Sequence, residues 1–301
     1  MQTLCGLFGK SRQAWYDEQK REDNAGLQAG LLLDEVRRLR LDLPSVGVDV
    51  LHYQLTDFRQ QHGIKIGRDK LADLLRESGL LIKKRSRQVK TTWSHHHYFK
   101  YSNLTIGKKV LAPNQLWVSD ITYILVGRGF GYPSLITDAY SRKIVGWALD
   151  ASLQAAGPIT ALKMALKTNK GRLDAALIHH SDRGVQYCSG AYLDRLRQAK
   201  ITISMTESGD PNENALAERV FRTLKEEFDL WGFPTFSMAE TAIKQAIVAY
   251  NSLRPHGSLG YKTPNQAHQG QGHQSLKWYP YKKVRYGNVQ YQADYQPCSP
   301  L

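Results

Sequence analysis

Three acidic residues occupy positions where a carboxylate is unusual. Asp120 lies within the apolar run NQLWVSDITYIL and, by strand alternation, shares a face with its apolar neighbours. Burying a carboxylate there is costly unless it is paired or bound to a metal. Asp182 directly follows the apolar run ALIHHS, and Glu218 lies opposite the apolar face of a predicted helix. Oxygen ligands of this kind suit a hard divalent cation.

Each acid alone has an ordinary explanation. An aspartate at the end of a strand usually caps a turn, and a glutamate on an exposed helix face is usually solvated. The three together are more specific, because a strand acid, a strand-end acid and a helix acid follow in order, with 35 residues between Asp182 and Glu218. On the helix, Arg222 and Lys225 follow Glu218 on the same face.

The elements around these acids predict a mixed α/β fold. From Pro113 onward, strand-like runs come first and then alternate with helical runs, which predicts a mixed sheet with helices on both faces. The expected strands cover residues 114–125, 130–140, 142–149, 175–179 and 201–205, and the expected helices cover residues 158–170, 191–198, 214–228 and 238–252.

The first 80 residues are predicted to be helical. Leucines and valines recur at helical spacing over residues 25–41, 48–58 and 71–75, and glycines at 63 and 79 are plausible helix ends. Two short helices joined by the turn GIKIG, with basic side chains at 68, 70 and 76, fit a helix-turn-helix. An ordinary helical hairpin fits the same pattern, but the basic segment that follows favours DNA binding.

The charge of the chain points to a polyanionic partner. Its 301 residues, enough for about two domains, carry a formal net charge of +14. Residues 78–119 contain no acid and eight Lys or Arg, interleaved with aromatic residues that can stack on bases. A solvated linker is the alternative; a metal-binding tract at His95–His97 is disfavoured, because no Cys or acid lies nearby. The predicted DNA contacts here are Lys83, Lys84, Arg85 and Arg87.

Several classes of protein are excluded. No apolar stretch approaches the 18 or so residues that a membrane span needs, and residues 1–16 lack the features of a signal peptide. The three cysteines, Cys5, Cys188 and Cys298, are far apart and form neither a disulfide framework nor a zinc site. We therefore expect a cytoplasmic protein without a membrane partner.

The sequence resembles the DDE transposase and retroviral integrase superfamily, and most closely the second-frame (OrfB) product of the IS-three family of bacterial insertion sequences. The N-terminal run GIKIGRDKLADLLRESGL (63–80) is similar to that family's helix-turn-helix. Five later segments match in order: PNQLWVSDITYI (113–124), TDAYSRKIVGW (137–147), HHSDRGVQY (179–187), SMTESGDPNENALAERVFRTLK (204–225) and YNSLRPHGSLGYKTP (250–264). One departure from the family pattern is Glu213, where the family commonly has aspartate. Glu213 and Asp210 are therefore carboxylates that could compete with the three acids as ligands.

The resemblance implies an RNase-H-like integrase core in which Asp120, Asp182 and Glu218 are the catalytic residues and the metal ligands. The implied cofactor is Mg²⁺, as two ions about 3.5–4 Å apart, with Mn²⁺ able to substitute. The implied reaction is cleavage at the element ends and joining of the 3′-OH to target DNA. Lys225 matches a basic position that such enzymes aim at the DNA end, and Arg222, Arg254 and His256 are further predicted DNA contacts.

The same resemblance implies the partners and the domain order. The first partner is double-stranded DNA, both as the terminal inverted repeats of the element and as the target. The chain is also expected to form a homo-oligomer of at least two copies, and the upstream first-frame protein is a fusion or a partner. All of these are expected at the bacterial nucleoid. The expected domains are a helical segment (1–43), a helix-turn-helix-like domain (44–88), a basic linker (89–112), the DDE core (113–268) and a tail (269–301). Two alternatives remain open: a non-catalytic DNA-binding regulator or inactive remnant, and a nuclease that hydrolyses DNA without joining it.

Overall fold

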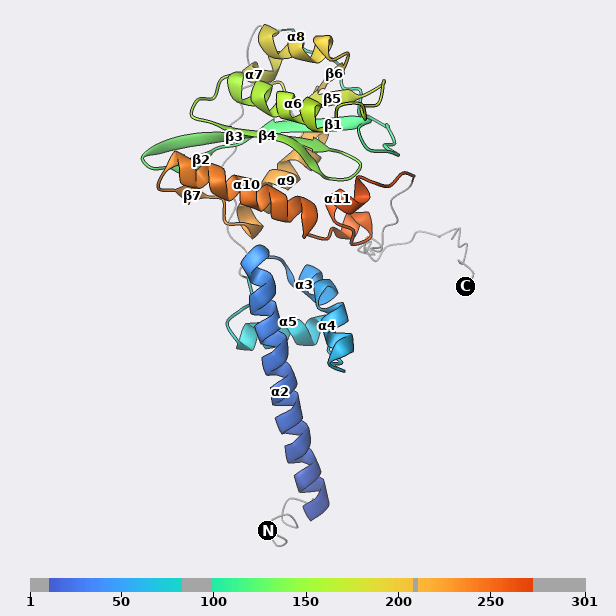
Figure 1. Ribbon diagram of the computed structural model, residues 1–301, viewed down its shortest axis with the longest axis vertical. Helices are drawn as coiled ribbons and strands as arrows, with labels where there is room; N and C mark the ends of the chain where they lie inside the picture. The colour runs from blue at the N-terminus through green and yellow to red at the C-terminus, as the bar shows by residue number, and fades with distance from the viewer. Residues whose placement is uncertain (1–10, 83–98, 208–210, 273–301) are drawn as a thin grey trace, which may run out of the picture.

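The computed structural model describes residues 11–82, 99–207 and 211–272 (Figure 1). A helical N-terminal part and an α/β part follow one another along the long axis of the molecule. The four basic residues predicted to contact DNA at 83–87, the histidine run at 95–97 and Asp210 lie outside the described residues.

The α/β part is built on one mixed sheet, as the sequence predicted. Its strand order is β6-β5-β1-β3-β2-β7, and β4 also pairs with β3. The pairs β1–β5, β5–β6 and β2–β7 are parallel, and β3 runs antiparallel to β1, β2 and β4. The strands are β1 (Leu116–Ile121), β2 (Ile124–Val126), β3 (Gly129–Asp138), β4 (Ile144–Asp150), β5 (Ile178–Ser181), β6 (Thr202–Met205) and β7 (Gly232–Phe233).

The strand predicted at 114–125 is divided into β1 and β2. Both pair with β3, and the interruption at Thr122 lies opposite Pro133, whose carbonyl accepts the Thr122 N–H. Proline has no N–H to return to the ladder, so regular pairing stops there. This interruption follows Asp120 by two residues.

Helices cover both faces of the sheet (Figure 1). On one face lie α6 (Ala156–Thr168), α7 (Val185–Cys188) and α8 (Gly190–Gln198); on the other lie α9 (Ala215–Glu227), α10 (Phe236–Ser252) and α11 (Pro264–Ala267). Two short 3₁₀ helices, η1 (Pro211–Asn214) and η2 (Gly257–Leu259), precede α9 and α11.

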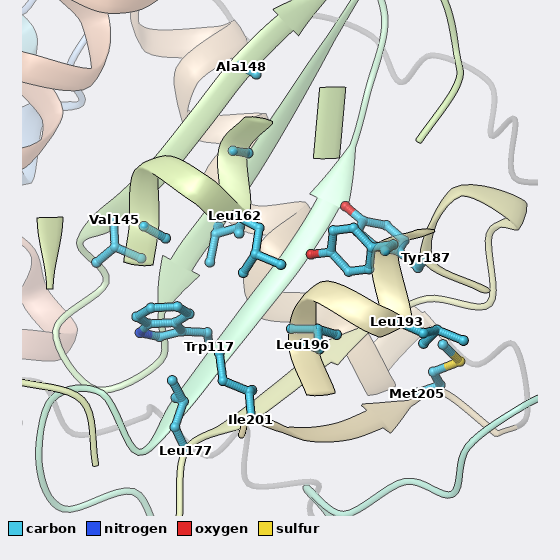
Figure 2. Close-up of a cluster of buried hydrophobic side chains, with 14 of the residues drawn as sticks. Trp117, Val145, Ala148, Leu162, Leu177, Tyr187, Leu193, Leu196, Ile201 and Met205 are labelled. Carbon is cyan, nitrogen blue, oxygen red and sulfur yellow. The ribbon is translucent and has the colours of Figure 1, made fainter. Parts of the chain in front are cut away.

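Alternation along β1 decides which side chains face which layer. Trp117 is fully buried in the first layer, in one cluster with Leu162 of α6 and Leu196 of α8 (Figure 2). Val118 packs in a different cluster with Ala217 of α9. Asp120, two residues further along β1, therefore faces the α9 side.

Gly146 marks the closest approach of β4 to α6. A Cβ atom at this position would lie 2.2 Å from the carbonyl oxygen of Ala161 and 2.9 Å from the Ala165 Cβ. We expect Gly146→Ala to lower the free energy of unfolding by about 1–3 kcal/mol, measured by urea denaturation, because the helix must move off the sheet. Gly30→Ala is the control, because nothing lies within 4 Å and helix propensity predicts a small gain of about 1 kcal/mol. Equal effects at the two glycines would contradict this packing.

Within residues 11–82 the structure has the helices α2 (Arg12–Asp42), α3 (Val48–Gln54), α4 (Thr56–Gln61) and α5 (Arg68–Glu77). Helix α2 begins 13 residues before the predicted start at 25, with the Ser11 side chain accepting the Ala14 N–H. Its first half is exposed, so it has no apolar periodicity that the sequence could reveal. The single helix predicted over 48–58 is divided at Leu55, whose side chain joins the buried core of this part. None of the described helices combines the length and apolar character needed to cross a membrane.

Candidate active site

Asp120 and Asp182 lie side by side at the ends of two neighbouring parallel strands. The register of β1 and β5 pairs Ser119 with Ser181; Asp120 is the next residue on β1, and Asp182 directly follows the end of β5. Alternation along β1 places the Asp120 carboxylate on the α9 side, and the charge of Asp182 acts on it. The Asp120 Oδ1 accepts the Ile121 N–H at 2.8 Å, and the Asp182 Oδ1 accepts the Gly184 N–H at 3.0 Å.

Glu218 approaches the same place from helix α9. The side chain of Asn214, which precedes the first turn of α9, donates to the Ser119 carbonyl at 3.1 Å and so fixes the start of the helix beside Asp120. Glu218 follows Asn214 by four residues, about one helical turn, and its side chain is exposed. The structure thus brings all three predicted acids to one edge of the sheet.

Asp120 is affected by the charges of both other acids. Burial raises its pKa well above the usual range, although part of the residue reaches solvent, and the negative charges of Asp182 and Glu218 raise it further. The Ile121 N–H and the Lys225 ammonium oppose this shift without cancelling it. A cation between the acids would relieve the repulsion.

The donor set suits a hard divalent cation, because all three groups offer carboxylate oxygens. Over residues 11–82, 99–207 and 211–272, however, no three Asp, Glu, His or Cys side chains are close enough together to hold one metal ion. Asp120 and Asp182 offer two carboxylate groups as ligands for a cation. Glu218, on α9, is the third acid whose charge acts on Asp120.

Lys225 lies beside the acids, two turns after Glu218 on α9. Its Nζ donates to the Thr122 Oγ1 and to the Tyr123 carbonyl, both at 2.8 Å, and lies 5.0 Å from the centre of the Tyr123 ring. Burial lowers its pKa to about 8, against the attraction of Asp120. The amine remains mostly protonated at neutral pH.

The other predicted DNA contacts occupy different environments. Arg222 is exposed on α9, where its Nε pairs with the Glu226 carboxylate at 3.0 Å. Arg254 is only 8% exposed, and its guanidinium makes two 2.6 Å bonds to the Glu227 carboxylate. His256 is partly buried against Arg254, and this burial together with the Arg254 charge lowers its pKa to about 2. Arg254 is thus paired within the protein, whereas the Nε2 atom of His256 has no hydrogen-bond partner among the described residues.

Comparisons with known proteins place this geometry in a family. Residues 111–211 and 199–264 match two family models, both described as "Integrase core domain". The chain is 33% identical to the "Insertion element IS600 uncharacterized 31 kDa protein" of Shigella sonnei, over 87% of this chain and 96% of that one. It is 32% identical to "Transposase InsF for insertion sequence IS3A" of Escherichia coli strain K12, over 71% of this chain and 74% of that one. The chain belongs to the IS-three family of insertion-sequence transposases.

Solved structures similar to this transposase include integrases. The catalytic core domain of HTLV-2 integrase, described in complex with magnesium, is 19% identical, with a TM-score of 0.43 over 53% of this chain and 99% of that one. A simian T-cell lymphotropic virus intasome in complex with PP2A regulatory subunit B56 gamma is 15% identical, with a TM-score of 0.44 over 84% and 77%. The strand order and the integrase core matches together assign the transposase an RNase-H-like DDE core and make it an enzyme of the transposase/integrase class.

Sequence reasoning missed the polar layer that supports the acids. On one face of the sheet, the Ser119 hydroxyl bonds the Tyr187 hydroxyl at 2.8 Å. On the other, His180 lies 2.8 Å from the Ser204 Oγ and 3.1 Å from the Glu213 carbonyl, and so holds the segment that leads into α9. The Glu213 carboxylate, predicted as a rival ligand, accepts the Glu207 N–H instead. The available signal was the polar run HHS at the end of an otherwise apolar strand.

His179 makes this layer sensitive to acid. Burial, and then the neighbouring His180, lowers its pKa to about 3, and its Nε2 lies 2.9 Å from the Tyr192 hydroxyl. Between pH 6.5 and about 3 the unfolded chain binds one more proton at this position, so stability falls on acidification by about 1.4 kcal/mol per pH unit.

We therefore expect His179→Gln to reduce the slope of unfolding free energy against pH below 6.5 by roughly that amount, measured by urea denaturation at several pH values. His62→Gln, at an exposed position on the same chain, is the control. An unchanged slope in His179→Gln would mean that this imidazole is protonated in the folded protein.

Proposed function

We propose that this transposase cleaves DNA at the ends of its insertion element and joins the resulting 3′-OH to target DNA, with Asp120, Asp182 and Glu218 as the catalytic residues. The observation that carries the proposal is that Asp120 and Asp182 each directly follow a member of the Ser119–Ser181 register pair of β1 and β5, while Glu218 lies one helical turn after the contact of Asn214 with β1. Such a pair can hold a cation against a phosphodiester without any covalent enzyme intermediate.

The proposed cofactor is Mg²⁺, as two ions, with Mn²⁺ able to substitute. When bound, such ions supply an activated nucleophile and stabilise charge on the attacking and leaving oxygens. Asp120 would be the shared ligand, because the negative charges of both Asp182 and Glu218 act on it. Lys225 offers an ammonium group two residues beyond Asp120, at Thr122, where a strand end could be held.

The proposed partner is double-stranded DNA, as element ends and target. The net charge of +14 and the exposed Arg222 support this. We assign recognition of the DNA ends to residues 44–88 and catalysis to residues 113–268. The linker 89–112 is proposed to contact the DNA backbone, together with the basic residues just before it, Lys83, Lys84, Arg85 and Arg87. Synapsis of two ends requires at least two copies of the chain at the nucleoid, and the first-frame protein is a further proposed partner.

A joining assay tests the function. DNA flanking the source gene, labelled at an exposed 3′-OH end, is incubated with the full chain, Mg²⁺ and plasmid target. We expect the label to become covalently attached to the plasmid. Shortened labelled strands without attachment would indicate a hydrolytic nuclease, and binding without any strand cleavage would indicate a regulator.

A further inference from the structure

Two aromatic rings, one exposed and one partly exposed, lie beside the candidate active site. Tyr123 occupies the interruption between β1 and β2, and Phe130 lies at the start of β3; their ring centres are 5.4 Å apart in an edge-to-face arrangement. The Phe130 residue is 49% exposed. Leu125, directly opposite it in the hairpin, is 54% exposed. These side chains form a continuous apolar surface on the β2–β3 hairpin.

This surface is flanked by cations. The Lys225 Nζ lies 5.0 Å from the centre of the Tyr123 ring, and Arg128 is exposed in the turn of the hairpin, next to Gly127 with its φ of 57°. A protein surface that combines rings with ammonium or guanidinium groups suits single-stranded nucleic acid, whose bases stack while its phosphates are neutralised.

The surface is also close to the acids. Tyr123 follows Asp120 by three residues, a chain length that spans at most about 10 Å. One DNA strand advances about 3.4 Å per nucleotide. A phosphate held at the acids therefore places the next two or three bases of its strand within reach of the two rings.

We propose that the Tyr123–Phe130 pair binds unpaired bases at the DNA end, next to the position of cleavage. This rests on the proposed function, because the DNA-binding residues 44–88 and the basic linker must first bring the DNA end beside the acids. Bases inside a duplex have both faces covered, so only bases that have left their partners can stack on these rings. The pair thereby favours an opened end over a closed duplex.

Fluorescence of 2-aminopurine tests the proposal. The probe replaces one of the last three bases of an end duplex that is either fully paired or mismatched over those three positions, and the full chain is added without divalent cation. We expect the wild type to quench the probe and to bind the mismatched end more tightly. Phe130→Ala should lose the quenching and weaken binding to the mismatched end about tenfold, while binding to the paired duplex stays unchanged.

Two further variants keep the result interpretable. Val248→Ala removes an apolar side chain that is 58% exposed on α10, and should behave as the wild type. Phe130→Trp keeps a ring and should retain the quenching. Equal binding of both duplexes by the wild type, or an equal loss on both in Phe130→Ala, would overturn the proposal. Because no cation or cleavage is needed, quenching without joining would separate failure of the proposed function from failure of this site.

Discussion

Replacing Asp120 with asparagine is expected to slow Mg²⁺-dependent joining by at least 10²-fold and, in the absence of metal, to raise the unfolding temperature. The joining falls because a neutral amide is a poor ligand for a hard cation, and charge stabilisation by such a cation is worth several kcal/mol. The stability rises because the substitution removes a partly buried charge that Asp182 and Glu218 repel. Asparagine keeps an oxygen for the Ile121 N–H, so the local backbone bond survives.

The two opposite effects distinguish a catalytic acid from a structural one. Each kcal/mol gained shifts the midpoint by roughly 2–4 °C in a domain of this size, which differential scanning calorimetry resolves. Asp194→Asn is the matched control, because this acid is exposed on α8 and pairs only with Arg197 in the described structure. Asp182→Asn and Glu218→Gln should lose joining as well, and all three variants should still bind element-end DNA. Near-normal joining by any one of them would refute the proposed catalytic set.

Local sequence patterns predicted the acids but not the way in which they meet. Asp120 and Asp182 are recognisable because each interrupts or ends an apolar strand. Their adjacency depends on the parallel pairing of β1 with β5, and no periodicity within either strand encodes that register. The same holds for Glu218, whose position depends on the long-range bond from Asn214 to Ser119. Recognition of the family motifs, rather than local patterning, joined the three residues in advance.

The burial of Arg254 also depends on long-range packing. An arginine in the run NSLRPHG is indistinguishable in sequence from an exposed DNA contact. Its acidic partner, Glu227, is 27 positions earlier on another helix, and only the packing of α9 against the end of α10 brings them together. Conversely, the exposed first half of α2 has no apolar periodicity that would predict a helix. Its start is determined by helix propensity and by the Ser11 cap.

Disrupting the Glu227–Arg254 pair is expected to cause the largest loss of stability. Both side chains are mostly buried, at 15% and 9% exposure, and Glu227→Gln would leave the Arg254 guanidinium buried without its counter-charge. Loss of one partner from a buried pair costs about 3–5 kcal/mol, measured by urea denaturation. Glu226→Gln is the control, because its pair with Arg222 is exposed and worth at most about 1 kcal/mol. Similar small losses in both variants would show that water reaches the Arg254 pair.

The double replacement Glu227→Leu with Arg254→Met then tests whether Arg254 contacts DNA. Because both charges are removed together, most of the stability should return. A folded variant without Arg254 allows its DNA binding to be measured directly as a function of salt. A side chain that contacts one phosphate contributes about 0.9 to the slope of log affinity against log salt concentration. We expect the slope of the double variant to equal that of the wild type, since Arg254 serves to join α9 to the chain after α10. A slope reduced by about one would return Arg254 to the DNA interface.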